Sequence, residues 1–319
     1  TRRSSDLMKL VNSNKFAQKR IASIRKWLDN SENQNLVEGN CNAKFLEFQR
    51  NGMHPGVLSN YIQRYGHWVF SRGLVTSTGC SITDPIPKDT LVGFSCYYVA
   101  FLLRCHQYQF DAKKMAGMCS LHDAALWMSI GYTFGFHRQA SIMGMIIADG
   151  IPKQMFSDIH TVMGAYLPKI WAETLGKKLP PPTKRAREPA EYDQWKSSQI
   201  WDKLVASFGN DDENRFEQDI AEACEWHKLE SKYPSNSRRY EFDLDERQLF
   251  PSELYMLMRI RADQGLTVSP ISDEILWFPF ERIKSLTSEL QFDEFMSPVF
   301  EKLRRDIPLL EGGWVTESI

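Results

Sequence analysis

Residues 90–105 read TLVGFSCYYVAFLLRC, a run in which Arg104 carries the only charge. Apolar side chains such as Phe94 and Tyr98 recur at the spacing that places them on one face of an α-helix. The opposite face is apolar as well, so we expect this helix to be buried on both sides. Only six charged side chains occur between residues 90 and 148, and this stretch is therefore expected to form the centre of the fold.

Helical spacing of apolar residues continues through most of the chain. It predicts a helix that begins after Ser120 and further helices over 6–28, 43–50, 57–71, 162–175, 190–208, 213–232, 250–265 and 291–305. Pro168 lies within the apolar stripe of 162–175, where the helix either kinks or gives way to a new one. Strand signals are weak, and residues 266–271 are the best candidate. The sequence thus predicts an all-α fold, an irregular multi-helix array or bundle.

Residues 177–190, KKLPPPTKRAREPA, are the clearest break in this helical pattern. Three consecutive prolines favour an extended path, and five basic residues keep the segment solvated. We therefore expect an N-terminal helical region over 1–176, with its apolar core at 90–148. The Pro-rich basic linker would join it to a C-terminal helical region over 191–319. The two sub-bundles can still share one core.

Composition excludes several classes of protein. Of the 319 residues 42% are hydrophobic and 12% aromatic, too many for a disordered chain. The longest uncharged runs have fourteen residues, whereas a transmembrane helix needs about 20. The basic N-terminus leads into no apolar signal segment, and the six cysteines show no CxxC spacing, which favours reduced thiols. We expect a cytoplasmic protein that has no membrane partner.

Familiar catalytic motifs are missing from the sequence. It lacks the glycine-rich nucleotide-binding motifs and the zinc-binding HExxH motif. Residues 93–96, GFSC, begin like a nucleophile elbow, but Tyr97 stands where the second glycine is required. None of the seven histidines lies four residues from another histidine or a cysteine, the spacing that puts two metal ligands on one helix face. We therefore expect no enzyme activity, no metal and no cofactor.

Two alternative functions remain open at this stage. The first is a helical enzyme with a pocket in the 90–148 core, whose candidate groups are Tyr98, Arg104, His106 and His122. A structural histidine bonded to a neighbouring carbonyl is the more common arrangement. The second is nucleic-acid association through the basic residues of 1–28 and 183–187. The balanced net charge of −1 does not favour it, and we expect no nucleic-acid partner.

Charge is unevenly distributed along the chain. Residues 1–28 carry eight basic residues against one acid, whereas residues 211–230 carry eight acids against two basic residues. A second acidic run, Asp-Leu-Asp-Glu, occupies 243–246. Such charge is ordinary for a solvated helix face or turn. The alternative is that the acidic face receives a basic protein partner, since opposite potentials speed encounter and fix register.

The C-terminal half resembles a known group of proteins. An acidic helix ends in ACEWHK at 223–228, and FPSEL at 250–254 opens a helix that ends RIRADQGL at 259–266. A short extended piece then leads to ILWFP at 275–279. This spacing, over about residues 215–280, is similar to that of the all-α immunity proteins encoded beside bacterial polymorphic and secretion-delivered toxins.

The resemblance implies a role in bacterial competition. A member of this group neutralises its cognate toxin by direct protein–protein contact in the cytoplasm of the producing cell. Toxins of such systems are often nucleases with basic active-site surfaces, which suits an acidic acceptor. The residues expected to contact the toxin electrostatically are Asp211, Asp212, Glu213, Glu217, Asp243, Asp245 and Glu246.

Overall fold

The computed structural model describes residues 14–78, 80, 83–111, 118–157, 161–177, 179, 194–233 and 240–307. Its N-terminal helices are α2 (Lys15–Leu28), α3 (Ser31–Gln34), a π-helical turn (Asn35–Gly39), α4 (Asn40–Asn51), α5 (Pro55–Ser77), α6 (Lys88–Asp111), α7 (Leu121–Thr133), α8 (His137–Gly150) and α9 (Val162–Thr174). The C-terminal helices are α10 (Gln194–Ser207), α11 (Glu213–Glu230), α12 (Asp245–Leu249), α13 (Ser252–Asp263), a 3₁₀ turn (Phe280–Arg282) and α14 (Met296–Asp306).

The all-α prediction is confirmed. Within the described residues, β-pairing is limited to one isolated bridge between Ser120 and Ser157. The strand expected at 266–271 is wrong: these residues form an irregular loop. The main chain there bonds to the end of α13, since Leu266 N donates to Arg261 O at 3.1 Å and Arg261 Nε donates to Thr267 O at 2.7 Å.

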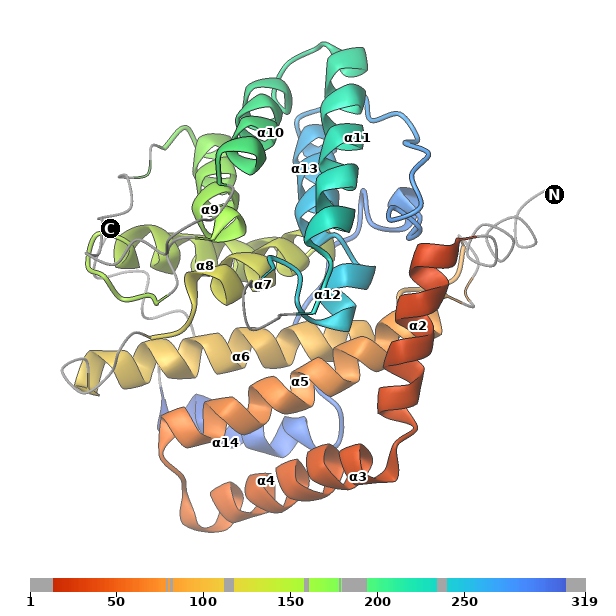
Figure 1. The fold of residues 1–319 in the computed structure, drawn as a ribbon. Coiled ribbons are helices and arrows are strands. Elements are labelled where there is room, and N and C mark those ends of the chain that lie inside the picture. Colours follow the sequence, from red (N-terminus) through yellow and green to blue (C-terminus); the bar gives the residue numbers. More distant parts are fainter. Residues whose placement is uncertain are drawn as a thin grey trace.

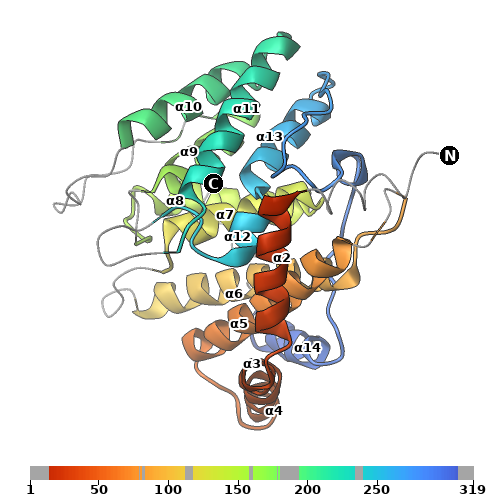
Figure 2. The ribbon, with the colours of Figure 1, turned by 45° about the vertical axis from the view of Figure 1, so that its right-hand side comes forward.

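Helices α5 and α6 lie side by side across the middle of the molecule (Figure 1). Helices α3, α4 and α14 lie on one side of this pair, and α7 to α13 lie on the other (Figures 1 and 2). The residues from Val92 to Leu103 are almost all buried, as the apolar character of both faces predicts. The long α6 helix is therefore the centre of the hydrophobic core.

The two regions expected from the sequence pack directly against each other. Ser129 on α7 and Ser252 on α13 are hydrogen-bonded at 2.7 Å, and both are buried. Tyr65 on α5 donates to Asp293 at 2.7 Å. The sequence separations, 123 and 228 residues, show that distant parts of the chain share one core. Most of the 177–190 linker and all of 183–187 lie outside the described residues.

Two details of the helix predictions can be compared with the structure. Helix α9 runs unbroken from Val162 to Thr174 with Pro168 inside it, so no new helix starts at the proline. Helix α2 buries Ile21, Ile24 and Leu28, as its apolar spacing predicts. The first 13 residues of the chain, which include the start of the predicted 6–28 helix, lie outside the described part.

Glycines allow α5 and α6 to approach closely. A Cβ atom added to Gly66 would lie 2.6 Å from Cys96 Cβ. One added to Gly93 would lie 2.5–2.7 Å from the main chain and Cβ of Phe70. Contacts this short require the helices to move apart, because the obstacle at Gly93 is largely main chain. The spacing of the central helix pair therefore depends on these two glycines.

We expect Gly93→Ala to lower the free energy of unfolding by about 1–3 kcal/mol, because overpacking outweighs the better helix propensity of alanine. Gly39→Ala is the matched control, since its added methyl meets nothing within 4 Å. It should leave stability unchanged or raise it by up to about 1 kcal/mol. Urea unfolding followed by circular dichroism measures both, and equal stabilities would contradict the close-packing argument.

Candidate functional site

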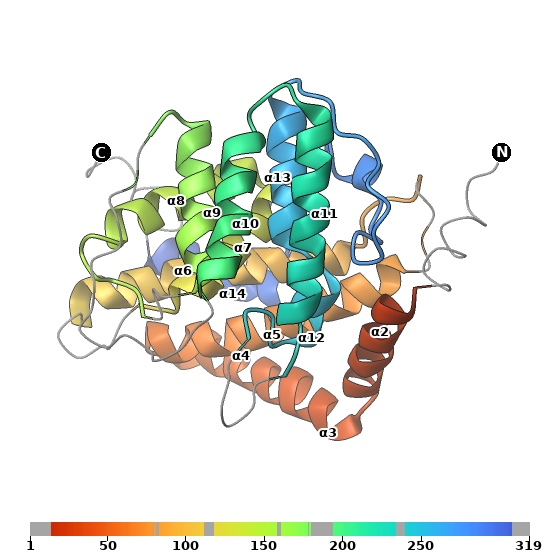
Figure 3. The same cartoon turned by 45° about the horizontal axis from the view of Figure 1, so that its top comes forward.

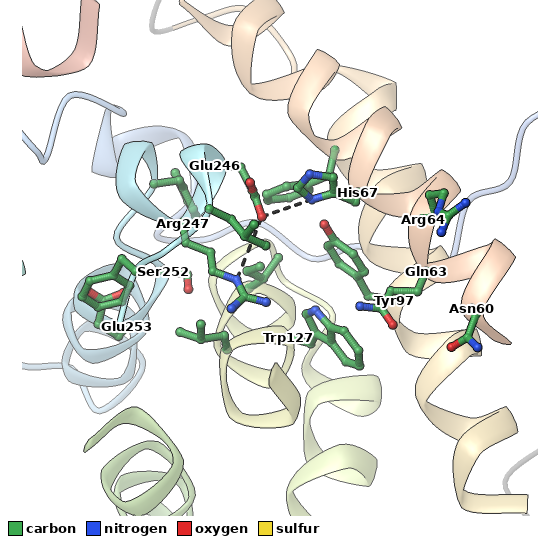
Figure 4. A pocket seen from close by; sticks show the side chains of 16 residues that line it. Asn60, Gln63, Arg64, His67, Tyr97, Trp127, Glu246, Arg247, Ser252 and Glu253 are labelled. Carbon is green, nitrogen blue, oxygen red and sulfur yellow. Dashed lines mark ion pairs between the residues drawn. The ribbon is translucent and has the colours of Figure 1, made fainter. Parts of the chain in front are cut away.

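A pocket of about 420 Å³ opens between α5, α6, α7 and the segment that contains α12 (Figure 4). Apolar side chains line part of it, including Phe70, Ile130 and Phe250. Its polar and aromatic lining comprises Asn60, Gln63, Arg64 and His67 of α5, Tyr97 of α6, Trp127 of α7, Glu246 and Arg247 of α12, and Ser252 and Glu253 of α13. The pocket thus combines apolar walls with several charged groups.

Arg247 is a cation of the pocket with three carboxylate neighbours. Its Nη2 lies 2.5 Å from Asp123, its Nη1 lies 3.4 Å from Asp243, and its Nε lies 4.0 Å from Glu246. Burial alone would lower the pKa of Arg247, but these carboxylates outweigh it and raise the pKa above its usual value. The guanidinium therefore stays charged, and its three nitrogens are directed at three carboxylates.

Glu246 is a buried carboxylate on the same helix. Its Oε1 lies 3.1 Å from His67 Nδ1, an ion pair drawn in Figure 4. Burial alone would raise the pKa of Glu246, but His67 and Arg247 lower it below its usual value. The pKa of Asp123 is lowered in the same way: burial alone would raise it, but Arg247 and His122 lower it by more. Both carboxylates are therefore ionised at neutral pH.

Aromatic rings form the wall opposite Arg247 (Figure 4). The rings of Tyr97 and Trp127 stack with centroids 5.5 Å apart and planes 9° from parallel. The guanidinium of Arg104 covers Trp127, 5.9 Å from the ring centroid. Burial raises the pKa of Tyr97, so its hydroxyl keeps its proton. Tyr97 also packs against Phe70 of α5, with ring centroids 5.8 Å apart, so the wall joins α5, α6 and α7.

Two amides stand at the pocket mouth. Arg104 donates to Asn60 Oδ1 at 3.0 Å and also to Gln63 Oε1. Because a guanidinium only donates hydrogen bonds, both amides must turn their oxygens toward Arg104. Their NH₂ groups are then left to serve as donors at the mouth. Sequence spacing alone indicated no such role for Arg104.

A buried histidine–carboxylate pair lies behind the pocket. His227 is fully buried, with Nδ1 2.6 Å from Glu253 Oε1 and Nε2 3.2 Å from Gln248 O. Its ring stacks on Phe242 with centroids 3.9 Å apart. Both ring nitrogens therefore face oxygen atoms, which fixes the orientation of the imidazole. The second oxygen of Glu253, Oε2, is buried and has no hydrogen-bond partner.

The predicted contact residues fall into two separate groups. Asp211, Asp212 and Glu217 are exposed at the start of α11, where Asp212 also caps the helix by accepting from Arg215 N at 3.0 Å. Glu213 is half-buried beside Ser269. The 243–246 group lies at the other end of α11, next to α12 (Figure 1). Eighteen helical residues span roughly 27 Å, so the two groups do not form one surface.

One predicted contact residue needs correction. Glu246 is only 6% exposed, because its side chain turns into the pocket toward His67 and Arg247. It is not available as a surface charge. Asp243 and Asp245 are half-buried, and Asp245 accepts hydrogen bonds from Tyr233 at 2.5 Å and from Ser23 of α2 at 2.7 Å. Leu244, which lines the pocket, and Tyr233 are exposed. These four residues, next to the pocket in sequence or in contact, are called the rim.

The residues proposed for the enzyme alternative do not line this pocket. Tyr98 is buried and stacks on Phe94, while His122 is buried with Nδ1 3.3 Å from Glu241. His106 is half-buried, and burial lowers its pKa.

Across the described ranges, no group of three or more His, Cys, Asp or Glu side chains could hold a metal ion. Sequence reasoning missed His67 and Arg247. The only local signal was that Arg247 directly follows the acidic run at 243–246.

Comparisons with known proteins leave the family open. No family model, curated protein or solved structure matched the chain. In addition, no helix of the described segments is long and apolar enough to cross a membrane. The pocket, its rim and the resemblance in sequence spacing are therefore the features that bear on function.

We expect Asp123→Asn to lower the free energy of unfolding by about 2–3 kcal/mol at neutral pH, since it leaves Arg247 without its nearest carboxylate. The folded-state pKa of Asp123 lies below its usual value of 3.8, so the ion pair contributes fully above that value. Its contribution is lost as the pH falls through the folded pKa. The difference between wild type and variant should therefore shrink toward about pH 3.

Urea unfolding over this pH range measures the effect, with exposed Asp211→Asn as the control. A difference that stays constant down to the lowest pH would contradict the assignment of the stabilising charge to Asp123.

Proposed function

We propose that the protein is a helical immunity protein that binds a basic toxin at the pocket and its rim and neutralises it by direct contact. The observation that carries this proposal is the cluster of carboxylates around Arg247 at the pocket. Asp123, Asp243 and Glu246 surround the single guanidinium of Arg247. Carboxylates beside a concave, partly apolar surface are suited to contact with a basic partner.

The rim supplies the apolar contacts that affinity requires. Leu244 is 38% exposed and also lines the pocket, and Tyr233 is 53% exposed beside Asp245. Hot spots of protein interfaces combine such aromatic and aliphatic side chains with a polar surround that excludes water. The rim and pocket together have this character, whereas Asp211, Asp212 and Glu217 lie on a purely polar helix end. The pocket end of α11 is therefore the better candidate interface.

The resemblance in spacing over residues 215–280 supports the same function, because that range includes α11, α12 and α13 and thus much of the pocket. By analogy with that group, the protein would act in the cytoplasm of the cell that makes the toxin. A nuclease with a basic substrate surface is the kind of toxin that fits the acidic rim.

An enzyme is the second candidate, and the His67–Glu246 pair favours it. A carboxylate 3.1 Å from Nδ1 orients an imidazole for proton abstraction through its other nitrogen. This candidate ranks second because Glu246 also balances Arg247, a structural role that explains its burial. If the protein is an enzyme, His67→Gln should abolish its turnover.

The proposed function is tested by capture followed by a growth assay. The tagged protein is purified gently from its source organism, and native mass spectrometry identifies any basic polypeptide bound in a stoichiometric complex. That polypeptide, expressed in a laboratory host, should arrest growth, and co-expression of this protein should restore it. A captured polypeptide that is harmless, or no stoichiometric partner at all, would refute the proposal.

Leu244→Lys locates the interface in the same growth assay. It places a positive charge at the pocket rim and removes no side-chain hydrogen bond, so we expect protection to be lost and affinity to fall at least about tenfold. Leu46→Lys is the matched control, since Leu46 is 50% exposed on α4, which contributes no residue to the pocket. If both variants protect equally well, the toxin binds elsewhere.

A further inference from the structure

We infer that the pocket binds a small organic monocarboxylate, with the carboxylate between the indole N–H of Trp127 and the guanidinium of Arg247 and the apolar body against the apolar walls. This inference goes beyond the proposed function and is independent of it. It concerns a small molecule in the interior of the pocket, whereas a protein partner would contact the rim from outside. The pocket volume of about 420 Å³ is within the range of small-molecule sites.

The interior of the pocket holds hydrogen-bond donors that lack an acceptor. Trp127 and Tyr97 line the pocket and are each only 3% exposed. Among the described residues, neither the indole N–H of Trp127 nor the hydroxyl of Tyr97 has a hydrogen-bond partner, and neither atom is sealed within the core. A donor held out of bulk water without an acceptor costs free energy that a ligand oxygen would recover. The two side chains therefore favour a ligand that accepts hydrogen bonds.

Arg247 presents further donors opposite Trp127 (Figure 4). A guanidinium has five N–H groups, and within the described part of the chain two of those of Arg247 are hydrogen-bonded, to Asp123 and Asp243. Its Nε lies 4.0 Å from Glu246, too far for a hydrogen bond, so three N–H groups remain. A carboxylate accepts hydrogen bonds through two oxygens and can therefore receive from both Arg247 and Trp127. An ammonium group has no acceptor and can receive from neither.

The charged groups of the lining can accommodate one more negative charge. The acidic and basic side chains of the described lining are Arg64, His67, Arg247, Glu246 and Glu253. Each carboxylate already faces a basic group: Glu246 lies 3.1 Å from His67. Glu253 lies 2.6 Å from His227. Arg64, by contrast, forms no ion pair with any described residue. A single anionic group therefore meets no unpaired carboxylate in the lining.

The mouth carries positive charge and further donors. Arg104 donates to Asn60 Oδ1 at 3.0 Å and to Gln63 Oε1, which leaves the NH₂ groups of both amides at the opening. Arg64 is exposed at the same opening, and Arg104, like Arg64, forms no ion pair among the described residues. Positive charge at the entrance of a partly apolar cleft raises the local concentration of anions. The mouth therefore favours the entry of an acid over that of a base.

The walls favour an acid that has an apolar body. Buried apolar side chains line the pocket, namely Phe70, Leu126, Ile130, Phe242 and Phe250. An aromatic or aliphatic body placed against them leaves water, whereas acetate would leave this surface wetted. A phosphate ester carries about two negative charges at neutral pH, more than the unpaired Arg64 alone can offset. A monocarboxylate with an apolar body is therefore the better match.

Nuclear magnetic resonance of the unaltered protein tests this inference. The readout is the indole N–H signal of Trp127, assigned by its loss in Trp127→Phe. The probes are 3-phenylpropanoate, its neutral amide, acetate and 2-phenylethyl phosphate. We expect 3-phenylpropanoate to shift the signal saturably with a dissociation constant on the order of 1 mM, and the other three to bind at least about tenfold more weakly. Equal binding of the amide, tighter binding of the phosphate, or no saturable shift from 3-phenylpropanoate would overturn the inference.

The variant Trp127→Phe adds a second comparison, because it removes the indole donor and keeps an aromatic ring. Saturation-transfer measurements, which observe the ligand, should show 3-phenylpropanoate bound about tenfold more weakly than by the unaltered protein. Trp201→Phe is the matched control: Trp201 on α10 also has an indole N–H without a described partner, but it contributes nothing to the pocket. It should bind 3-phenylpropanoate as the unaltered protein does.

Equal affinities of Trp127→Phe and Trp201→Phe for 3-phenylpropanoate would show that the carboxylate does not lie beside Trp127, and the inference would fall. The comparison of the four probes needs no variant and therefore stands even if Trp127→Phe folds poorly.

Discussion

The ion pair between Arg247 and Asp123 is the interaction on which the candidate site depends. It joins α12 to the first turn of α7 across 124 residues of sequence. Together with the Glu246–His67 ion pair and the buried Leu249 it holds the short α12 helix against the central helices, because five residues of helix do not persist by themselves. The pocket is the space that remains when α12 is held in this way, with α5 and α6 fixed by their glycine contacts on the opposite side.

Burying charged side chains such as Arg247 and Glu246 costs free energy of folding. Removing a guanidinium and three carboxylates from water opposes folding, and the attraction between them repays the cost only where hydrogen bonds satisfy the remaining groups. Here each guanidinium nitrogen faces a carboxylate, and His67 meets Glu246. A hydrophobic cluster could supply equal stability, but it would not place charged groups against the pocket. The charged cluster is therefore consistent with the binding role proposed above.

Sequence patterns predicted the helices well and the site poorly, for a physical reason. The two apolar faces of 90–105 follow from residue spacing along one helix, and local spacing is sufficient to predict burial. Likewise Phe216, Ile220 and Cys224 are buried on α11, as their spacing predicts. The pocket instead unites His67, Asp123 and Arg247, which no periodicity connects. For Glu246, composition predicted a solvated acidic turn, whereas its partner on α5 is 179 residues away and draws it inward.

The sequence distances within the pocket also determine when it forms. The α5–α6 pair is a local hairpin of consecutive helices, whose short connection makes its association entropically cheap and early. The closure that unites α7 with α12 spans 124 residues, and non-local contacts of this kind form slowly and late. During synthesis, a ribosome must extend the chain beyond α12 before any recess exists. The pocket is thus the last feature that a nascent chain acquires, well after its central helices are in place.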